Sequence, residues 1–220
     1  MNDSLLIAID GPSGSGKSST SRGVAERLHL AYLDTGSVYR AAAVAWLESG
    51  LSASETQAIT ELVAESVFEV GTDPTAPTIA VNGRDVTDEI RDPGVASQVS
   101  TIATIQAIRD IVTEQFRQTI DAHDRRIVVE GRDITTVVAP DADVRVLLVA
   151  DPTARIARRQ AELGARADSD EVVDQIVRRD RDDSTVSQFE TPAEGVTLVD
   201  STHLSLDEVI DAVVALAPQR

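Results

Sequence analysis

The chain has 220 residues, 42% of them hydrophobic, which is enough for one medium-sized folded domain with or without insertions. It has no cysteine, so disulfides, zinc–thiolate sites and cysteine nucleophiles are excluded. A net charge of −17 argues against nucleic-acid binding over a broad surface. The apolar runs are far shorter than the roughly 20 residues of a membrane helix. We therefore expect a cytoplasmic protein that binds neither nucleic acid nor a membrane.

A phosphate-binding loop lies near the start of the chain. Residues 11–18 read G-P-S-G-S-G-K-S, and Lys17 is the only lysine. An apolar segment at 5–9 precedes the loop and a helical pattern at 18–28 follows it, which is the context that the motif requires. Backbone N–H groups of such a loop surround a polyphosphate, the lysine reaches the outer phosphates and the serine hydroxyl ligates Mg²⁺. The donor site is therefore predicted on Gly11, Pro12, Ser13, Gly14, Ser15, Gly16, Lys17, Ser18 and Ser19, with Mg²⁺ on Ser18; a chance Gly/Ser-rich turn is the alternative.

The rest of the chain alternates short apolar runs with helical patterns, which predicts an α/β fold with a five-stranded, mainly parallel sheet. Strands are expected at 5–9, 31–33, 127–129, 144–150 and 196–199. Helices are expected at 18–28, 37–48, 54–66, 102–122, 152–163, 171–181 and 206–217. Possible caps are Ser54 with Gln57, Ser205 with Glu208, and Asp151 before Pro152. Because ligands bind beyond the carboxyl ends of parallel strands, we expect the polar junctions after these strands to form one site.

Two segments differ from this alternation. Residues 67–92 contain three short strand patterns, and Asn82-Gly83 between the last two indicates a two-residue hairpin. We interpret them as a small antiparallel insertion into a core formed by 1–66 and 93–220. Residues of about 155–185 are dense in arginine and aspartate and have little apolar pattern, so we interpret them as a helical lid.

A phosphate loop alone does not define a function, because many enzyme classes carry one. A GTPase would need a second lysine for its Asn-Lys-x-Asp motif, and the chain has none. An ATP-driven machine would typically have an apolar strand that ends in an Asp-Glu pair, and no such strand is found. Several charged residues fall at predicted strand ends and helix starts: Arg40, Arg109, Arg132 and Arg179, with Asp34, Asp133 and Asp183. Guanidinium groups bind phosphate oxygens bidentately, so this placement favours a kinase that holds two nucleotides. For any single arginine, a solvated surface position is the alternative.

Five blocks, at 9–18, 33–40, 81–91, 130–142 and 200–209, closely resemble bacterial cytidylate kinases and occur in the same order. They span nearly the whole chain, which makes the resemblance more specific than the loop alone. It implies ATP-dependent, Mg²⁺-assisted phosphorylation of CMP and dCMP. It also implies a monomer with the nucleoside monophosphate kinase fold: a P-loop NTPase core, a lid and an acceptor-binding insertion.

The resemblance further implies roles for individual residues. Lys17, Asp34, Arg132 and Arg179 are the candidates for catalysis, and the acceptor phosphate is assigned to Thr35, Tyr39, Arg40 and Arg132. Cytosine is assigned to Ser100, Arg109 and Asp133, while Arg179 and Asp183 of the lid are assigned to the ribose and phosphates. A carboxylate accepts from the cytosine amino group, whereas uracil presents the opposite pattern. The alternatives are a salt-bridge role for Asp133, a helix-capping role for Ser100 and a core-packing role for Tyr39.

The chain also departs from the family pattern. Val186 stands where an arginine is usual, and the candidates to replace that arginine are Arg178, Arg181, Arg155, Arg158 and Arg159. Thr135 stands where glycine is common, and Gln106 where proline is common. Two other functions therefore stay open: a kinase for another small acceptor such as UMP, and a catalytically weakened nucleotide-binding regulator.

Overall fold

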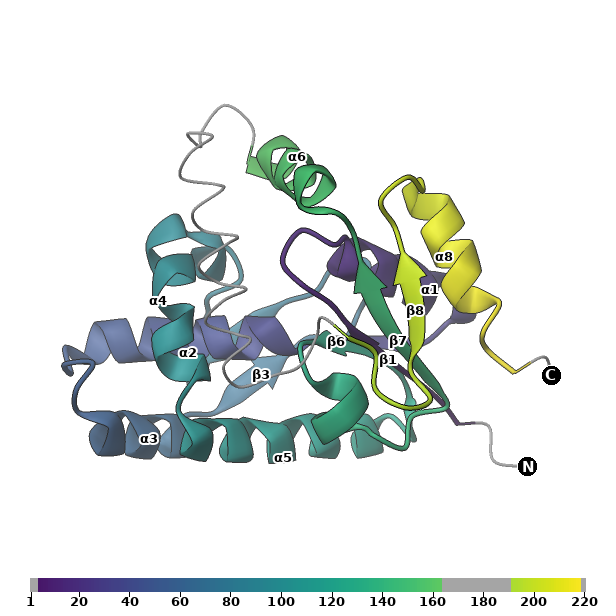
Figure 1. Ribbon diagram of the computed structural model, residues 1–220. Helices are drawn as coiled ribbons and strands as arrows, with labels where there is room; N and C mark the ends of the chain where they lie inside the picture. Colours follow the sequence, from purple (N-terminus) through teal and green to yellow (C-terminus); the bar gives the residue numbers. More distant parts are fainter. Residues whose placement is uncertain (1–3, 164–190, 219–220) are drawn as a thin grey trace.

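A five-stranded parallel sheet forms the centre of the computed structural model, which describes residues 4–163 and 191–218 (Figure 1). Its strands are β1 (Leu5–Asp10), β2 (Ala31–Asp34), β6 (Arg126–Gly131), β7 (Val144–Val149) and β8 (Thr197–Asp200). Their order is β2-β6-β1-β7-β8, and every neighbouring pair is parallel. The predicted α/β fold is confirmed, and all five predicted strands are present. Since the strands run in one direction, their carboxyl ends lie at one edge of the sheet.

Helices cover both faces of this sheet. On one face lie α1 (Lys17–Leu28) and α8 (Leu206–Val214), which pack against each other. The other face is covered by α2 (Thr35–Ser49), α3 (Thr56–Glu65), α4 (Pro93–Ala103) and α5 (Gln106–Ala122). Helix α6 (Pro152–Leu163) follows β7 and projects beyond its carboxyl end (Figure 1). Two short turns, η1 (Glu89–Arg91) and η2 (Ile134–Val138), complete the described elements. Among these elements, no helix combines the length and apolar character that crossing a bilayer requires.

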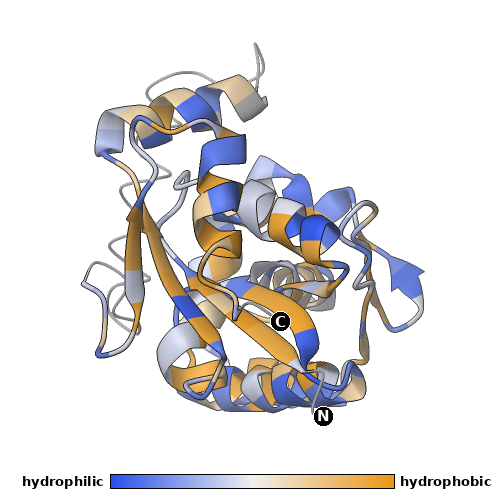
Figure 2. Ribbon diagram, turned by 90° about the vertical axis from the view of Figure 1, so that its right-hand side faces the viewer, coloured by the Kyte–Doolittle hydropathy of each residue, from blue (hydrophilic) through white to orange (hydrophobic). Residues whose placement is uncertain are grey.

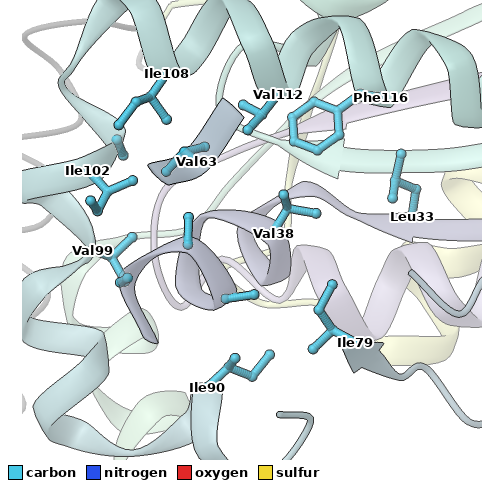
Figure 3. Packing of buried hydrophobic residues seen from close by; sticks show 14 of the residues in the cluster. Leu33, Val38, Val63, Ile79, Ile90, Val99, Ile102, Ile108, Val112 and Phe116 are labelled. Carbon is cyan, nitrogen blue, oxygen red and sulfur yellow. The ribbon is translucent and has the colours of Figure 1, made fainter. Parts of the chain in front are cut away.

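The central strand β1 shows why the strand sequences are continuously apolar. Leu6 and Ala8 belong to the core cluster on the α2–α5 face, whereas Leu5, Ile7 and Ile9 belong to the cluster on the α1–α8 face. Both faces of a parallel sheet covered by helices are buried, so successive residues must be apolar. Figure 2 shows the resulting hydrophobic strands between helices with hydrophilic outer surfaces. Members of the larger cluster, drawn in Figure 3, include Leu33, Val38, Val63, Ile79, Val112 and Phe116.

A second, three-stranded antiparallel sheet consists of β3 (Phe68–Val70), β4 (Ile79–Val81) and β5 (Arg84–Asp85). Asn82 and Gly83 have φ angles of 50° and 77°, the positive values that a two-residue hairpin turn requires. The predicted antiparallel strands are therefore confirmed. Strand β4 packs on α2, and Ile79 and Val81 belong to the larger core cluster, so this sheet is attached through a shared core.

The predicted single helix at 102–122 is wrong. Two helices, α4 and α5, cover this region, and the chain turns at Thr104–Ile105 between them. The start of α4 was missed, although it carries a recognisable signal. The Asp92 side chain accepts a hydrogen bond from Gly94 N at 2.7 Å, and Pro93 is the first helical residue. The helix was not predicted because its sequence contains glycine and serine, which have lower helix propensity than alanine.

The predicted caps have different outcomes. The capping box of Ser205 and Glu208 is present at the start of α8, so that prediction is confirmed. The box predicted at Ser54 is wrong: α3 begins after Glu55, whose carboxylate accepts from Ser52 N at 2.7 Å. This contact holds the preceding turn and leaves no side-chain cap on the helix. The expected helix at 171–181, with most of the predicted lid, lies outside the described residues.

Candidate functional site

The phosphate loop joins the carboxyl end of β1 to the start of α1, as predicted. Gly11 must be glycine, because a Cβ there would come 2.2 Å from the backbone oxygen of Leu148 on β7. Gly14 and Gly16 have φ angles of 74° and 88°, in the left-handed region. The loop thus passes close against the neighbouring strand and turns through conformations that other residues adopt at a cost.

The N-terminus of α1 presents its first backbone N–H groups at this loop. Gly16 is the N-cap, and none of the described side chains caps the helix there. The first N–H groups of a helix have no partner within the helix, and together with the helix dipole they favour an anion. Ser18 and Ser19 are exposed in this first turn. The arrangement is therefore suited to phosphate.

Lys17 lies beside two carboxylates, Asp34 at the end of β2 and Glu130 on the neighbouring strand β6. Its charge acts to lower the pKa of both groups. Lys17 is thus within electrostatic range of both carboxylates, at the end of the loop on which a polyphosphate would bind. Its use in phosphoryl transfer stays a prediction.

Asp34 has two structural partners. Its carboxylate caps α2 by accepting from Ser37 N at 3.1 Å, and it pairs with Arg40 Nη2 at 2.7 Å. Burial acts to raise the pKa of Asp34, but the charges of Arg40 and Lys17 outweigh it, and the pKa is lowered. Asp34 is therefore an ionised group that orients Arg40, six residues further along the chain.

Glu130 is a buried carboxylate that sequence reasoning did not select as a site residue. It is 1% exposed and accepts from the Tyr32 hydroxyl at 2.5 Å. Burial raises its pKa, and the nearby charge of Asp34 adds to this effect. The charge of Lys17 and a hydrogen bond from the Ser18 side chain act in the opposite direction. Glu130 therefore connects the lysine and the serine of the phosphate loop with β6.

Thr35 and Tyr39, both expected at the acceptor phosphate, lie in the first turns of α2. The Thr35 hydroxyl is buried and donates to the backbone oxygen of Glu130 at 2.7 Å. Its hydrogen is used in this contact, so donation to a phosphate oxygen requires the hydroxyl to turn away from Glu130. The Tyr39 ring packs edge-on against Phe116 with 6.1 Å between the ring centroids, and it borders the larger core cluster. The Tyr39 ring therefore packs against the core, which was the alternative to a binding role. Contact of Thr35 or Tyr39 with the acceptor phosphate stays a prediction.

Arg109 and Asp133 form a largely buried ion pair, with side chains 10% and 15% exposed. Arg109 lies in the first turn of α5 and also donates to the backbone oxygen of Ala103 at 3.0 Å. Asp133 therefore forms the salt bridge that was the alternative to a role in binding cytosine. Its contact with cytosine stays a prediction. Ser100 lies inside α4, so the helix-capping alternative is wrong. The structure therefore brings together a fixed donor and a fixed acceptor at the end of β6.

Arg132 connects the end of β6 to the phosphate loop, because its guanidinium donates to the backbone oxygen of Gly11. Asp10, the residue before this glycine, is 3% exposed and accepts hydrogen bonds from the segment after Asp133. Sequence reasoning missed Asp10 as well. It stands at the end of an apolar strand directly before the loop, which was the available signal.

Two arginines of α6 contact the phosphate loop from the opposite side. Arg155 Nη1 donates to the Ser13 backbone oxygen at 3.0 Å, and Arg158 Nη1 lies 3.2 Å from the Ser15 backbone oxygen. Arg158 also donates to Ser201 Oγ at 2.9 Å, after the end of β8. Of the arginines considered as replacements at position 186, these two lie against the donor loop. Arg178, Arg179, Arg181, Asp183 and Val186 lie outside the described residues.

The fold and this loop together define a nucleotide-binding protein of the P-loop class. The family model described as cytidylate kinase matches residues 7–219. The chain is 62% identical over 215 residues to the cytidylate kinase of Cutibacterium acnes, covering 97% of this chain and 96% of that protein. It is 42% identical to the cytidylate kinase of Streptomyces avermitilis, over 98% of this chain and 94% of that protein. It is 41% identical to the cytidylate kinase of Rhodococcus jostii, over 98% of this chain and 96% of that protein. The chain belongs to the cytidylate kinase family, whose reaction is ATP-dependent phosphorylation of CMP.

Proposed function

We propose that this chain transfers the γ-phosphate of ATP to CMP and dCMP, with the donor on the phosphate loop and the acceptor beside β6 and α2. The observation that carries the proposal is the buried Arg109–Asp133 pair next to Arg132, which itself contacts the phosphate loop. A cytosine ring needs one acceptor for its amino group and donors for its ring acceptors. The pair supplies both, at the end of β6, which lies beside the strand that leads into the phosphate loop.

The donor phosphates are assigned to residues 11–19. The glycine turns and the start of α1 provide backbone N–H groups, and Lys17 provides the positive charge. In phosphoryl transfer most of the catalysis comes from positioning and from neutralising charge on the transferred group. Lys17 and Arg132 therefore carry the largest expected effects on rate, together with Arg179, which lies outside the described residues.

The residues present fit a magnesium ion at Ser18. Mg²⁺ usually binds through one or two protein oxygens, substrate phosphates and waters rather than a full protein cage. The exposed Ser18 hydroxyl beside Glu130 suits that mode, and Asp34 would contact the ion through water. When bound, the ion supplies neutralisation of charge on the phosphate oxygens. Asp34 pairs with Arg40 and Glu130 bonds to the Ser18 side chain, so these carboxylates fix side chains that would hold the ion and the acceptor phosphate.

The acceptor phosphate is assigned to Thr35, Tyr39, Arg40 and Arg132, and the base to Ser100, Arg109 and Asp133. Arg40 is oriented by Asp34, and Arg132 by the Gly11 backbone oxygen. A phosphate oxygen of CMP is already a nucleophile, so no general base is required; Asp34 is the carboxylate to examine first. Arg179 and Asp183 are assigned to the ribose and phosphates.

A coupled assay of ADP formation over a panel of acceptors tests the proposal. We expect turnover with CMP and dCMP to exceed turnover with UMP and AMP. Equal or better use of UMP or AMP would overturn the acceptor assignment. Binding of ATP and CMP without formation of CDP in the presence of Mg²⁺ would overturn the transfer reaction itself.

A further inference from the structure

The Asp10 carboxylate makes three hydrogen bonds to one short segment of the chain. Oδ1 accepts from Ile134 N at 2.8 Å, and Oδ2 accepts from Thr135 N at 2.8 Å and Thr135 Oγ1 at 2.6 Å. Asp10 is only 3% exposed, and none of the described basic side chains forms an ion pair with it. Its charge is therefore satisfied by the start of η2 alone.

This contact lies where two neighbouring strands diverge. Asp10 is in register with Gly131 on β6, and beyond this pair β1 continues into the phosphate loop while β6 continues into Arg132 and Asp133. The carboxylate of Asp10 holds the residues directly after Asp133. Arg132 reaches back to the Gly11 backbone oxygen. The two contacts connect the start of the donor loop with the segment that carries the acceptor residues.

We propose that Asp10 is a positioning residue, which sets Arg132 and Asp133 at the distance from the phosphate loop that in-line transfer requires. This inference rests on the proposed function. It assigns to Asp10 no contact with either nucleotide. Transfer between two bound nucleotides depends strongly on their relative placement, so a buried carboxylate that joins the two binding segments contributes to rate as well as to acceptor affinity.

The first test is Asp10→Asn. The amide has a similar size, but it has one acceptor oxygen and a donating NH₂ group, so at least one of the donors at Ile134 and Thr135 loses its partner. We expect KM and Kd for CMP to rise about tenfold, since a hydrogen bond to a charged group is worth about 1.5–3 kcal/mol. The Kd for ATP is expected to change by less than about twofold, because the backbone of the loop itself is retained.

Thr135→Val is the second variant, and it removes only the hydroxyl contact. We expect a smaller change in the same direction, with CMP affinity reduced by about threefold and ATP affinity retained. Thr135→Ser keeps the hydroxyl and is expected to restore the wild-type KM. These variants keep the proposal testable if Asp10→Asn does not fold.

Asp143→Asn is the matched control. Asp143 is an exposed carboxylate that accepts from Leu6 N at 2.8 Å, near the amino end of the same strand. The amide can still accept from Leu6 N but carries no charge, so the substitution weakens a hydrogen bond of β1 far from the site. We expect a lower melting temperature and unchanged KM values. Hydrogen exchange of peptides covering 131–138 should increase in Asp10→Asn and stay at the wild-type rate in Asp143→Asn.

The outcomes separate the two hypotheses. If the wild-type chain neither binds nor phosphorylates CMP, the proposed function fails and the role of Asp10 falls with it. If the wild-type chain is active and Asp10→Asn leaves CMP binding and KM within about twofold, the positioning role alone is overturned. Equal losses of ATP and CMP affinity would also overturn it, because they indicate general damage to the site.

Discussion

Arg109 and Asp133 form an ion pair that joins the first turn of α5 to the end of β6. Both side chains are mostly buried, and Arg109 is also held by the Ala103 backbone oxygen. Removing one member of a buried pair leaves the other without compensation, which costs about 3–5 kcal/mol. The two groups assigned to the cytosine are therefore held by each other as well as by the backbone.

Asp133→Asn tests the assignment of the base. The amide keeps the size of the side chain and presents a donor as well as an acceptor, so it no longer discriminates against uracil. We expect the ratio of kcat/KM for CMP to that for UMP to fall at least about tenfold, as for loss of a hydrogen bond to a charged group. Steady-state kinetics with both acceptors measures this ratio. Asp141→Asn, which removes an exposed ion pair with Arg125, is the control and should leave it unchanged. An unchanged ratio in Asp133→Asn removes Asp133 from the base site.

Lys17→Ala tests the donor site. Loss of the ammonium group removes the positive charge between the phosphate loop, Asp34 and Glu130. We expect kcat to fall by about 10³-fold or more, on the scale seen when a cation acting on the transferred phosphate is removed. Binding of CMP, measured by calorimetry, is expected to persist. Near-normal turnover would contradict the assignment of Lys17.

Arg158→Gln tests the contact between α6 and the phosphate loop. Arg158 bonds to the backbone of Ser15 and to Ser201, so its loss loosens the loop from the side opposite β6. We expect KM for ATP to rise by about three- to tenfold and KM for CMP to stay within about twofold. Arg125→Gln, at a partly exposed arginine paired with the exposed Asp141, is the matched control. Equal changes in both KM values would indicate that α6 does not act through the donor loop.

Glu130→Gln tests the effect of a buried carboxylate on stability. Burial, with the charge of Asp34 in addition, raises the pKa of Glu130 above its ordinary value of 4.5. A raised pKa in the folded state means that stability is present below the unfolded pKa and is lost as the pH rises through the folded pKa. The glutamine side chain at position 130 does not titrate. The melting temperature of this variant relative to wild type should therefore increase as the pH is raised from about 4.5 to 8.

Glu208→Gln is the control for this pH series. Hydrogen bonds from the backbone and side chain of Ser205 lower the pKa of Glu208, so it is ionised in both folded and unfolded states above about pH 5.5. The difference in melting temperature between this variant and wild type should be constant over that range. A constant difference for Glu130→Gln as well would show that Glu130 does not carry the predicted burial cost.

The sequence predicted the sheet, the hairpin and the phosphate loop because their signals are local. The apolar run of β1 and the dipeptide Asn82-Gly83 each indicate one conformation without reference to distant residues. Asp10 and Glu130 each follow an apolar run, but this local pattern does not indicate that they are buried. Their burial depends on parallel pairing of β1 and β2 with β6, which brings together segments far apart in the chain. A carboxylate at the end of an apolar strand has the same sequence pattern whether solvent or another strand surrounds it.

The break between α4 and α5 shows a different limit of prediction. Apolar residues continue at helical spacing through Ile102, Ile105 and Ile108, which favours one uninterrupted helix. The observed turn at Thr104 lets Ile102 and Ile108 both enter the larger core and places Arg109 beside Ala103. The geometry of the proposed base site depends on this turn, so the local pattern could not provide it.

The strand order has a consequence for synthesis of the chain. Strand β1 leaves the ribosome before both of its neighbours and is central in the sheet; it pairs only with residues 126–131 and 144–147. Such long-range parallel pairing is slow to form and leaves strand edges exposed until it is complete. The nucleotide-binding motif is thus translated early and assembled late, and a nascent chain shorter than about 126 residues carries the motif without the neighbours that support it.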